Sequence, residues 1–484
     1  MTHSTVGARL ARALIVVAAV LAPTGCAVGP DYARPPVAVT DGYKEAEGWK
    51  PARPRDDIPR GAWWEIFGDP ELSALESRVS VSNQNLAVAE AQFREARAAF
   101  FPQITVGVGV SRSRSSANVP ITIGGPPGAR SNYTLPLDVS WELDVWGRIR
   151  RQVESNRAAA QASAGDLETA RLSVQAELAQ DYFELRTLDA QKQLLEATVA
   201  VYQETLTLTQ NRYASGVVSR ADVLQAETQL RSTEAQAIDV GVQRAQLEHA
   251  IALLIGQPPA AFSLAAAPLA GAPPSIPAGL PSELLERRPD IAAAERRVAA
   301  ANAAIGVAKA AYYPTVTLSA SAGFQSSSPA QWLVWPSRFW SVGPNVSETV
   351  FDGGLRGALT DQARAAYDAS VAVYRQAVLT AFQSVEDNLA ALRILEDEAR
   401  TQDAAVKAAR QSVIVTTNQY KAGTVSYLSV ITVQAIALAN ETTAVQILGR
   451  RMTAAGLLIQ ALGGGWNVDE LPSAREVTTP ARRS

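Results

Sequence analysis

Residues 211–219 read Asn-Arg-Tyr-Ala-Ser-Gly-Val-Val-Ser, and residues 418–426 read Asn-Gln-Tyr-Lys-Ala-Gly-Thr-Val-Ser. A second pair of matching segments lies upstream of them. Phe100-Phe101-Pro102 begins an alternating run to Val110, and Tyr312-Tyr313-Pro314 begins a similar run to Phe324. We infer that one unit, made of a helix, a strand pair, a very long helix, a tight turn and a long helix, is duplicated in tandem.

Two very long helices are expected, one in each repeat. Although the chain has 27 prolines, none occurs from Leu137 to Gln257 or from Asn345 to Leu471. The segment Ile149–Tyr213 is rich in Ala, Gln, Leu, Glu and Arg, which are strong helix formers. About 65 residues at a rise of ~1.5 Å give a rod near 100 Å long. The matching rod is Leu355–Tyr420, and such rods need partners that bury their apolar stripes.

Each rod is predicted to end at its Asn-x-Tyr-x-x-Gly motif. Gly216 and Gly423 fit the left-handed position that terminates a helix. Ser219 and Ser426 are suited to cap the helices that follow, and Asp222 completes a capping-box pattern with Ser219. The chain therefore reverses sharply at both turns and forms two helical hairpins.

Four segments alternate apolar and polar residues over about ten positions, which is typical of transmembrane β-strands. They are residues 104–110, 133–143, 316–324 and, more weakly, 340–346. Five of the nine tryptophans lie in or beside them, as a belt at the membrane interface requires: Trp141, Trp146, Trp332, Trp335 and Trp340. The alternative is a half-buried sheet of a soluble protein, which shows the same alternation.

Four strands are too few for a closed membrane barrel, because the smallest barrels have about eight. An open sheet edge in hydrocarbon would leave each N–H and C=O group unsatisfied, at several kcal/mol apiece. We therefore expect the chain to share one barrel with copies of itself. The sequence permits two, three or four copies.

The N-terminus is typical of an exported protein. Two arginines precede the apolar run Ala13–Ala22, which is too short to span a bilayer. Cys26, the only cysteine, resembles the modified residue of a bacterial lipobox, although Pro23 stands where an aliphatic residue is usual. The resemblance implies a diacylglycerol thioether and an N-acyl chain on Cys26, and Ala27 in place of Asp favours sorting to the outer membrane. The alternative is an ordinary signal with an incidental thiol.

The domain organisation follows from these features. Residues 29–60 are rich in Pro, Arg and Asp and should form an extended tether without a core of its own. The predicted segments are a signal peptide at 1–25, a lipidated tether at 26–60, a first repeat at 61–271, a linker at 272–290, a second repeat at 291–468 and a disordered tail at 469–484.

Four blocks of sequence resemble one known family. The segment Cys26–Pro35 is similar to the mature N-terminus of outer-membrane factor lipoproteins, the NodT-type relatives of TolC that serve tripartite efflux pumps. Trp63–Leu72 and Ala461–Trp466 match further blocks of that family, and Leu280–Ile291, with its Leu-Leu-Glu-Arg-Arg-Pro-Asp-Ile, is the most specific match. The resemblance covers about residues 26–468.

The resemblance implies a mixed α/β membrane protein with a TolC-like fold. Three chains would share a barrel of about twelve strands that continues into a long periplasmic α-helical barrel. The implied function is a passive exit duct in the outer membrane, reached through a periplasmic adaptor (membrane fusion protein) from an inner-membrane RND pump. The alternatives are a duct for type I secretion or for metal or glycolipid export, and a non-conducting lipoprotein scaffold.

The family also indicates where a gate would lie. Its members commonly carry an acidic residue nine positions after the second-repeat glycine, but this chain has Thr432 there and Gln225 at the first-repeat equivalent. Asp222 is the alternative source of a carboxylate ring, with helix capping as its competing role. Ser429 takes the place of Asp222 in the second repeat.

An enzyme is disfavoured. The chain has two histidines, and His3 lies within the signal, so one cysteine and His249 cannot build a Cys/His metal site or a His-based triad. The carboxylates Glu386 and Asp387 lie on a long helix and are expected to be a solvated face. A net charge of −3 gives no reason to expect nucleic acid as a partner. We therefore expect no catalytic residue, no metal and no cofactor beyond the acyl chains.

Overall fold

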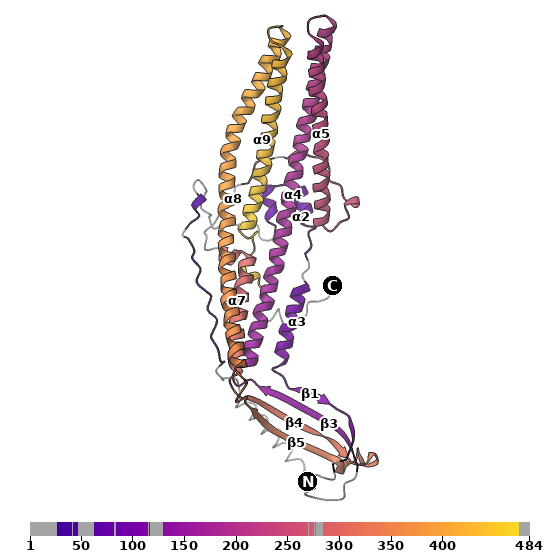
Figure 1. Ribbon diagram of the computed structural model, residues 1–484, viewed down its shortest axis with the longest axis vertical. Coiled ribbons are helices and arrows are strands. Elements are labelled where there is room, and N and C mark those ends of the chain that lie inside the picture. Colours follow the sequence, from indigo (N-terminus) through magenta and orange to yellow (C-terminus); the bar gives the residue numbers. More distant parts are fainter. Residues whose placement is uncertain are drawn as a thin grey trace.

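The computed structural model describes residues 27–40, 42–46, 62–81, 84–114, 116, 129–269, 271–274, 276 and 284–473. A small antiparallel sheet lies at one end, and long helices run from it to the opposite end (Figure 1). The helices are η1 Lys44–Ala46, η2 Trp63–Phe67, α2 Pro70–Glu76, α3 Gln84–Ala98, α4 Arg148–Ala214, α5 Arg220–Leu254, η3 Pro259–Ala261, α6 Leu284–Arg287, α7 Pro289–Ala310, η5 Pro329–Gln331, η6 Trp335–Ser337, α8 Leu355–Lys421, α9 Tyr427–Ala461 and η7 Val468–Glu470. The strands are β1 Gln103–Val106, β2 Gly109–Ser113, β3 Arg130–Leu143, β4 Thr315–Ser326 and β5 Arg338–Ser347.

The predicted duplication is confirmed. The order α3, β1–β3, α4, α5 is repeated as α7, β4–β5, α8, α9. Both rods, α4 and α8, have 67 residues, and both return helices, α5 and α9, have 35 residues. The equal lengths mean that the two hairpins reach about the same distance from the sheet.

The two strand pairs form one sheet in the order β1–β3–β4–β5, with β2 also paired to β3. Strand β3 pairs with β4 from Tyr133↔Ser326 to Leu143↔Val316, so the repeats meet at the centre of the sheet. Strands β1 and β2 form one edge and β5 forms the other. Among the described residues, neither edge has a further strand beside it.

The predicted strand over residues 104–110 is interrupted. Val106 pairs with Leu137 and Gly109 with Thr134, so the register is the same on both sides of the break. Opposite the break lies Pro136, which has no N–H to donate to the ladder. Only Gly107 keeps a bond there, from its N–H to the Pro136 carbonyl at 3.0 Å. Strands β1 and β2 are therefore one strand with a proline-induced gap.

One face of the sheet is apolar and open to the outside of the chain. Ile104, Val139, Ala320 and Val342 lie in one row across the strands. The apolar side chains of the β1–β2 edge are 62–72% exposed: Ile104, Val106, Val108 and Val110. The opposite face carries mainly Ser, Thr and Gly. Exposed apolar residues beside an unpaired edge fit a sheet that is completed by further strands in a membrane.

The main core lies where the helices of both repeats meet. Helix α7 packs against α4 and α8, and α9 packs against α8 and α4. Fully buried side chains from both rods fill this region, among them Leu185 and Tyr182 of α4 and Tyr374 of α8.

By length and composition, helix α9 would also suffice to cross a bilayer, with a mean hydropathy of 1.3 in its most apolar window.

The segment before the first repeat is extended, as predicted, but it is docked along the helices. Val28 N–H donates to the Trp146 carbonyl at 3.0 Å, and the buried Arg151 pairs with Asp31 at 2.7 Å. Gly29 lies so close to α7 that a Cβ atom there would be 2.5 Å from the Gly306 Cα. The sequence predicted an extended segment without a core of its own and gave no indication that it packs along the helices.

The expected solvated face at Glu386 is also corrected. The Glu386 carboxylate accepts the backbone N–H groups of Lys44 and Glu45 at 2.7 and 2.9 Å, so it fastens η1 to α8. Arg393 pairs with Glu45 at 2.6 Å beside it. Two adjacent donors of a short helix need an acceptor, and a carboxylate at the N-terminus of a helix supplies it.

The predicted disordered tail begins too early. Residues 468–470 form η7, and the Pro472 carbonyl accepts a hydrogen bond from Gln161 Nε2 at 3.0 Å. Residues 474–484 lie outside the described residues, as do the signal peptide, residues 47–61 and most of the linker before Leu284.

Glu76 at the end of α2 is expected to make stability depend on pH. It is 1% exposed, and neither of its carboxylate oxygens has a hydrogen-bond partner among the described residues. Burial raises the pKa of this carboxyl from 4.5 to about 9. The folded state thus holds a proton that the unfolded chain releases above pH 4.5, and stability should fall with rising pH by up to about 1.4 kcal/mol per pH unit.

Glu76→Gln removes the ionisation and should raise the thermal unfolding temperature at pH 8 while changing it little at pH 5. The exposed Glu71→Gln on the same helix is the control and should shift neither temperature. Equal effects of Glu76→Gln at both pH values would contradict the buried neutral carboxyl.

Candidate functional site

In both repeats, an aspartate stabilises the junction between the sheet and the long helix that follows it. Asp144 accepts the N–H groups of Ile149 and Arg150, each at 2.9 Å, and its carboxylate pairs with the Arg150 guanidinium at 3.1 Å. Asp352 accepts from Arg356 N–H at 3.2 Å and pairs with its guanidinium at 2.6 Å. A carboxylate at the positive end of each rod stabilises the helix where it leaves the sheet.

The rods end at the predicted glycines. Gly216 has φ 72° and Gly423 has φ 78°, which is the left-handed conformation. In the first turn, Gly216 N–H donates to the Tyr213 carbonyl and Val217 N–H donates to the Arg212 carbonyl, both at 2.9 Å. The second turn repeats this pair of bonds at 3.0 Å each. Both ends are Schellman motifs, at the end of the molecule farthest from the sheet (Figure 1).

The caps after the turns differ between the repeats. Ser219 and Asp222 form a full capping box, in which Asp222 accepts from Ser219 N–H at 2.9 Å and donates its own N–H to Ser219 Oγ at 3.3 Å. Ser426 occupies the N-cap position but makes no side-chain cap bond, and its hydroxyl lies 3.5 Å from that of Ser429. The expected side-chain cap by Ser426 is thus wrong, and its hydroxyl has the Ser429 hydroxyl as its neighbour instead.

The remaining candidate gate residues carry no charge. Gln225 and Thr432 are exposed, and the Thr432 hydroxyl donates to the Leu428 carbonyl at 2.9 Å on its own helix. Asp222 is partly buried. Burial raises the pKa of Tyr427, with smaller contributions from Tyr420, Tyr202 and Asp222.

Arg212 and Tyr420 join the two hairpins near their tips. Arg212 Nη1 donates to the Tyr420 carbonyl at 2.6 Å, and its guanidinium lies 4.5 Å from the centre of the Tyr420 ring. Tyr420 is 2% exposed and packs in a small apolar cluster with Tyr202, Leu206 and Tyr427. No pattern in the sequence indicates this contact, although both residues lie within the repeated motif.

The hairpins are less closely packed on the side of this contact that faces the sheet. A hollow of about 480 Å³ opens between α4, α8 and α9, and one of about 560 Å³ opens between α4, α5 and α9. Leu438 lines both, so they lie on either side of the α4–α9 contact. The first is mainly apolar and has the ion pair Arg410–Glu441 at its edge.

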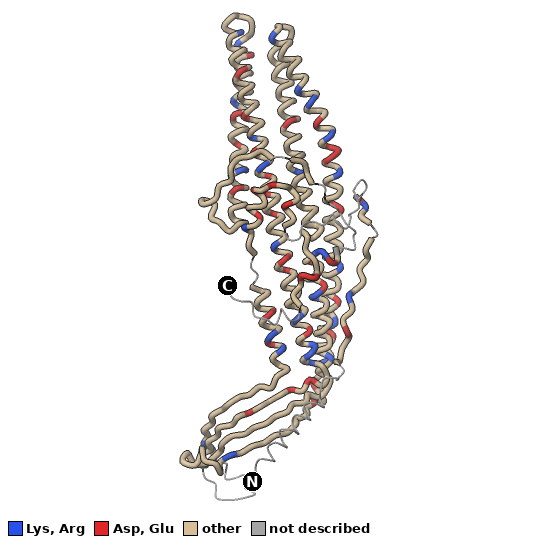
Figure 2. The backbone as a smooth tube through the Cα atoms, turned by 180° about the vertical axis from the view of Figure 1, so that it is seen from behind, with Lys and Arg blue, Asp and Glu red and all other residues tan. Residues whose placement is uncertain are grey.

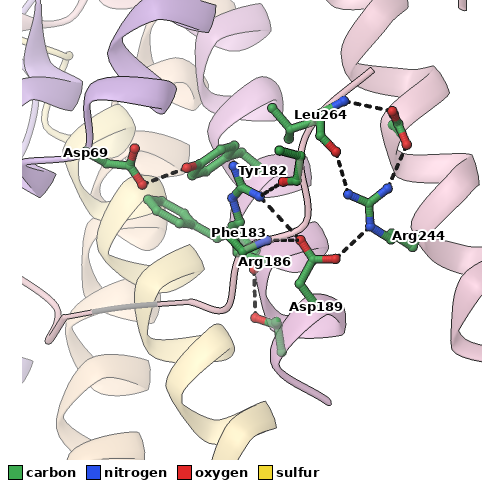
Figure 3. Close-up of polar contacts among 11 residues, drawn as sticks. Asp69, Tyr182, Phe183, Arg186, Asp189, Arg244 and Leu264 are labelled. Carbon is green, nitrogen blue, oxygen red and sulfur yellow. Dashed lines mark hydrogen bonds and ion pairs between the residues drawn. The ribbon is translucent and has the colours of Figure 1, made fainter. Parts of the chain in front are cut away.

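A buried polar network fixes the middle of the molecule, where the chain leaves α5 (Figure 3). Asp189, 6% exposed, pairs with Arg186 at 3.3 Å and with Arg244 at 2.6 Å, and it accepts from Ala267 N–H at 3.0 Å. Arg244 also donates to the Leu264 carbonyl at 2.7 Å. One carboxylate therefore fastens α5 and the segment after it to α4.

The five predicted belt tryptophans are divided between the two ends of the sheet. Trp141 and Trp146 lie near the helices and donate to the carbonyls of Phe100 and Pro314 at 2.9 and 2.8 Å. The other three, Trp332, Trp335 and Trp340, lie toward the opposite end. The exposed fractions of Trp335 and Trp340 are 72% and 78%. Their position in a membrane interface stays a prediction.

Cys26 lies outside the described residues. Its neighbour Ala27 lies against Gly147, whose added Cβ would be 2.7 Å from the Ala27 Cα. The chain therefore enters the described part of the molecule where sheet and helices join. His249 is exposed, and no group of three or more potential metal ligands occurs among the described residues.

These features define the class of protein, an outer-membrane channel with a TolC-like fold that extends into the periplasm. The family model described as outer membrane efflux protein matches residues 72–257 and again 280–464. The chain belongs to this family, whose members are channel proteins. The two matches correspond to the two repeats.

Individual relatives agree over most of their length. The toluene efflux pump outer membrane protein TtgC of Pseudomonas putida is 31% identical over 91% of this chain and 93% of its own. The pyoverdine export outer membrane protein OpmQ of Pseudomonas aeruginosa is 31% identical over 86% of this chain and 89% of its own. The solved structure of the outer-membrane channel OprN superposes with a TM-score of 0.83 at 31% identity, covering 91% of this chain and all of that one.

Proposed function

We propose that this chain is the outer-membrane exit duct of a tripartite RND-type efflux pump. The observation that carries the proposal is a sheet of four strands, with β1 and β2 counted as one, that has an apolar outer face and two unpaired edges and is continuous with two 67-residue helices. Such a chain supplies one sector of a wall that crosses a bilayer and the periplasm. It provides a path and a gate, and an inner-membrane pump reached through a periplasmic adaptor provides the energy.

Three copies would complete the wall. Three sheets joined edge to edge give a barrel of about twelve strands, which satisfies the N–H and C=O groups of β5 and of β1–β2. The hollows beside the α4–α9 contact would be covered by neighbouring copies or by adaptor helices. Chemical cross-linking of isolated membranes should yield a trimer, and cross-linking that stops at the monomer would contradict the shared barrel.

The names of the relatives support efflux as the transport class. One is assigned to toluene efflux and another to pyoverdine export. Deletion of the gene should raise susceptibility to some members of a panel of hydrophobic toxicants, and an affinity-tagged copy should retain the adaptor. Loss of secretion of a protein, or sensitivity confined to metal salts, would instead favour type I secretion or metal export. A null result in every assay would favour the non-conducting scaffold.

The gate is proposed to lie at the tips, where the Arg212–Tyr420 contact holds the hairpins together. Asp222 would add three carboxylates around a narrow bore and attract cations, an effect that salt weakens. Asp222→Asn should lower cation selectivity in single-channel recordings and leave the trimer intact. Glu227→Gln is the matched control, because it removes an exposed carboxylate farther from the turn. Unchanged selectivity with a less stable protein would restrict Asp222 to capping.

Cys26 is proposed to carry the acyl anchor. Cys26→Ser should abolish incorporation of labelled palmitate and cleavage of the signal. Some transport should survive, because the shared barrel also holds the protein in the membrane and acyl chains add only part of the anchoring. Continued palmitate incorporation by Cys26→Ser would refute the lipobox.

A further inference from the structure

The end of the sheet remote from the helices carries positive charge only. The strands β2 and β4 end there, and β3 and β5 begin there. The chain has no Asp or Glu from residue 96 to residue 137 or from residue 296 to residue 347. Figure 2 shows basic but no acidic residues at this end. Arg112, Arg114 and Arg338 are exposed there, and none of them forms an ion pair among the described residues.

The other end of the sheet is different. There the three arginines at the starts of α4 and α8 each have a carboxylate partner: Arg148–Glu142 at 2.7 Å, Arg150–Asp144 at 3.1 Å and Arg356–Asp352 at 2.6 Å. Arginines without a carboxylate partner are therefore a feature of the remote end and not of the whole sheet. Uncompensated arginines clustered at one end are expected to meet an external anion.

Two of these arginines point to the same side as the apolar face. Arg112 pairs with Ser131, two positions beyond the pair Val110↔Tyr133, and alternate residues of a strand share a face. Arg338 pairs with Phe324, and Trp340 follows on the same side. Both side chains therefore lie just past the apolar band, on its outward side, and Arg114 continues the alternation after Arg112.

Arg338 is held in place by an exposed tryptophan. Its guanidinium lies 3.0 Å from the centre of the Trp335 ring, and its Nε donates to the Trp335 carbonyl at 2.9 Å. Trp335 is 72% exposed. Stacking orients the planar guanidinium and leaves its two Nη groups available for a bidentate anion. An exposed indole beside a cation suits the region where lipid headgroups meet acyl chains.

We propose that Arg112, Arg114, Arg338 and Trp335 form a distal rim that binds the phosphate groups of anionic lipids in the outer leaflet of the outer membrane. The proposal rests on the proposed barrel, because only a membrane-spanning sheet brings this rim to a headgroup region. A lipid fits better than a free anion, since the arginines are aligned with the outward apolar face rather than with the polar one. A headgroup phosphate above acyl chains would contact rim and apolar band together.

The test uses the purified full-length protein in detergent and three probes. These are a bis-phosphorylated glycolipid, the same glycolipid after enzymatic dephosphorylation, and inorganic phosphate. Binding is measured at two salt concentrations for the wild type and for the triple variant Arg112→Gln, Arg114→Gln, Arg338→Gln. The control variant is Arg231→Gln, Arg364→Gln, Arg400→Gln, which removes the same charge from exposed positions on the helices.

The wild type and the control should bind the phosphorylated lipid, more weakly at high salt, and prefer it to the dephosphorylated form. The rim variant should lose at least about tenfold in affinity, since each arginine near an anionic surface contributes several-fold. Equal binding by the rim variant, no preference for the phosphorylated lipid, or inorganic phosphate binding as strongly as the lipid would each overturn the proposal. All three proteins should conduct in planar bilayers. Absence of conductance in the wild type would count against the duct, whereas a wild type that conducts but does not bind the phosphorylated lipid would count against the rim alone.

Discussion

Asp189→Ala is expected to lower the free energy of unfolding by about 3–5 kcal/mol, the range for breaking a buried ion pair by removing one partner. Asp189 is the common partner of Arg186, Arg244 and the Ala267 N–H. Its loss leaves Arg186, 4% exposed, without its carboxylate partner in the core. The segment after α5 would lose its Ala267 bond to α4 and, among the described residues, would keep only those of Ala265 and Leu269 with Arg186.

The thermal unfolding temperature and the yield of assembled protein measure this effect. Asp189→Asn should be intermediate, because the amide oxygen still accepts from Ala267 N–H but the charge is gone. Asp239→Ala, an exposed carboxylate on α5, is the control and should change stability little. If Asp189→Ala were as mild as Asp239→Ala, the network would not be a principal attachment of α5.

Val342→Arg should prevent or strongly reduce assembly in the membrane. Val342 lies near the middle of the apolar face, in the row Val139–Ala320–Val342. An arginine on the lipid face of a barrel costs about 2–4 kcal/mol near the bilayer midplane, and a trimer would incur this cost in every copy. The yield of heat-resistant trimer from membranes is the measurement.

Ser341→Arg is the matched control, because adjacent residues of a strand point to opposite faces. It adds the same side chain to the same edge strand on the polar face, where water in the bore would solvate it. Ser341→Arg should therefore assemble and alter ion selectivity. Equal assembly of both variants would mean that the apolar face does not contact lipid.

Periodicity predicted the regular elements because it is a local property. The rods were predicted to within two residues of α4 and α8, since long runs of helix formers between a strand and an Asn-x-Tyr-x-x-Gly turn leave no other arrangement. The gap between β1 and β2 could not be predicted, because it depends on which residue of β3 lies opposite. Pro136 removes a donor only in the register that the assembled sheet adopts.

Equivalent positions of the two repeats have different surroundings, which the repeated sequence does not indicate. Tyr213 and Tyr420 occupy equivalent positions, yet Tyr213 is 47% exposed and Tyr420 is 2% exposed. Two copies of a unit within one chain have different neighbours, so Arg212 meets Tyr420 across the hairpins without an equivalent in the other direction. Asp189 was missed for a similar reason, because only Arg186 lies at helical spacing and Arg244 is distant in sequence.

The central claim is that copies of this sheet close into a water-filled passage. It is tested most directly by adding the purified, cross-linked trimer to planar lipid bilayers and recording current under a fixed voltage. The proposed duct predicts discrete, uniform conductance steps that persist when the salt is changed and that are absent for Val342→Arg. Trimer that inserts into the bilayer without any such steps would contradict the account.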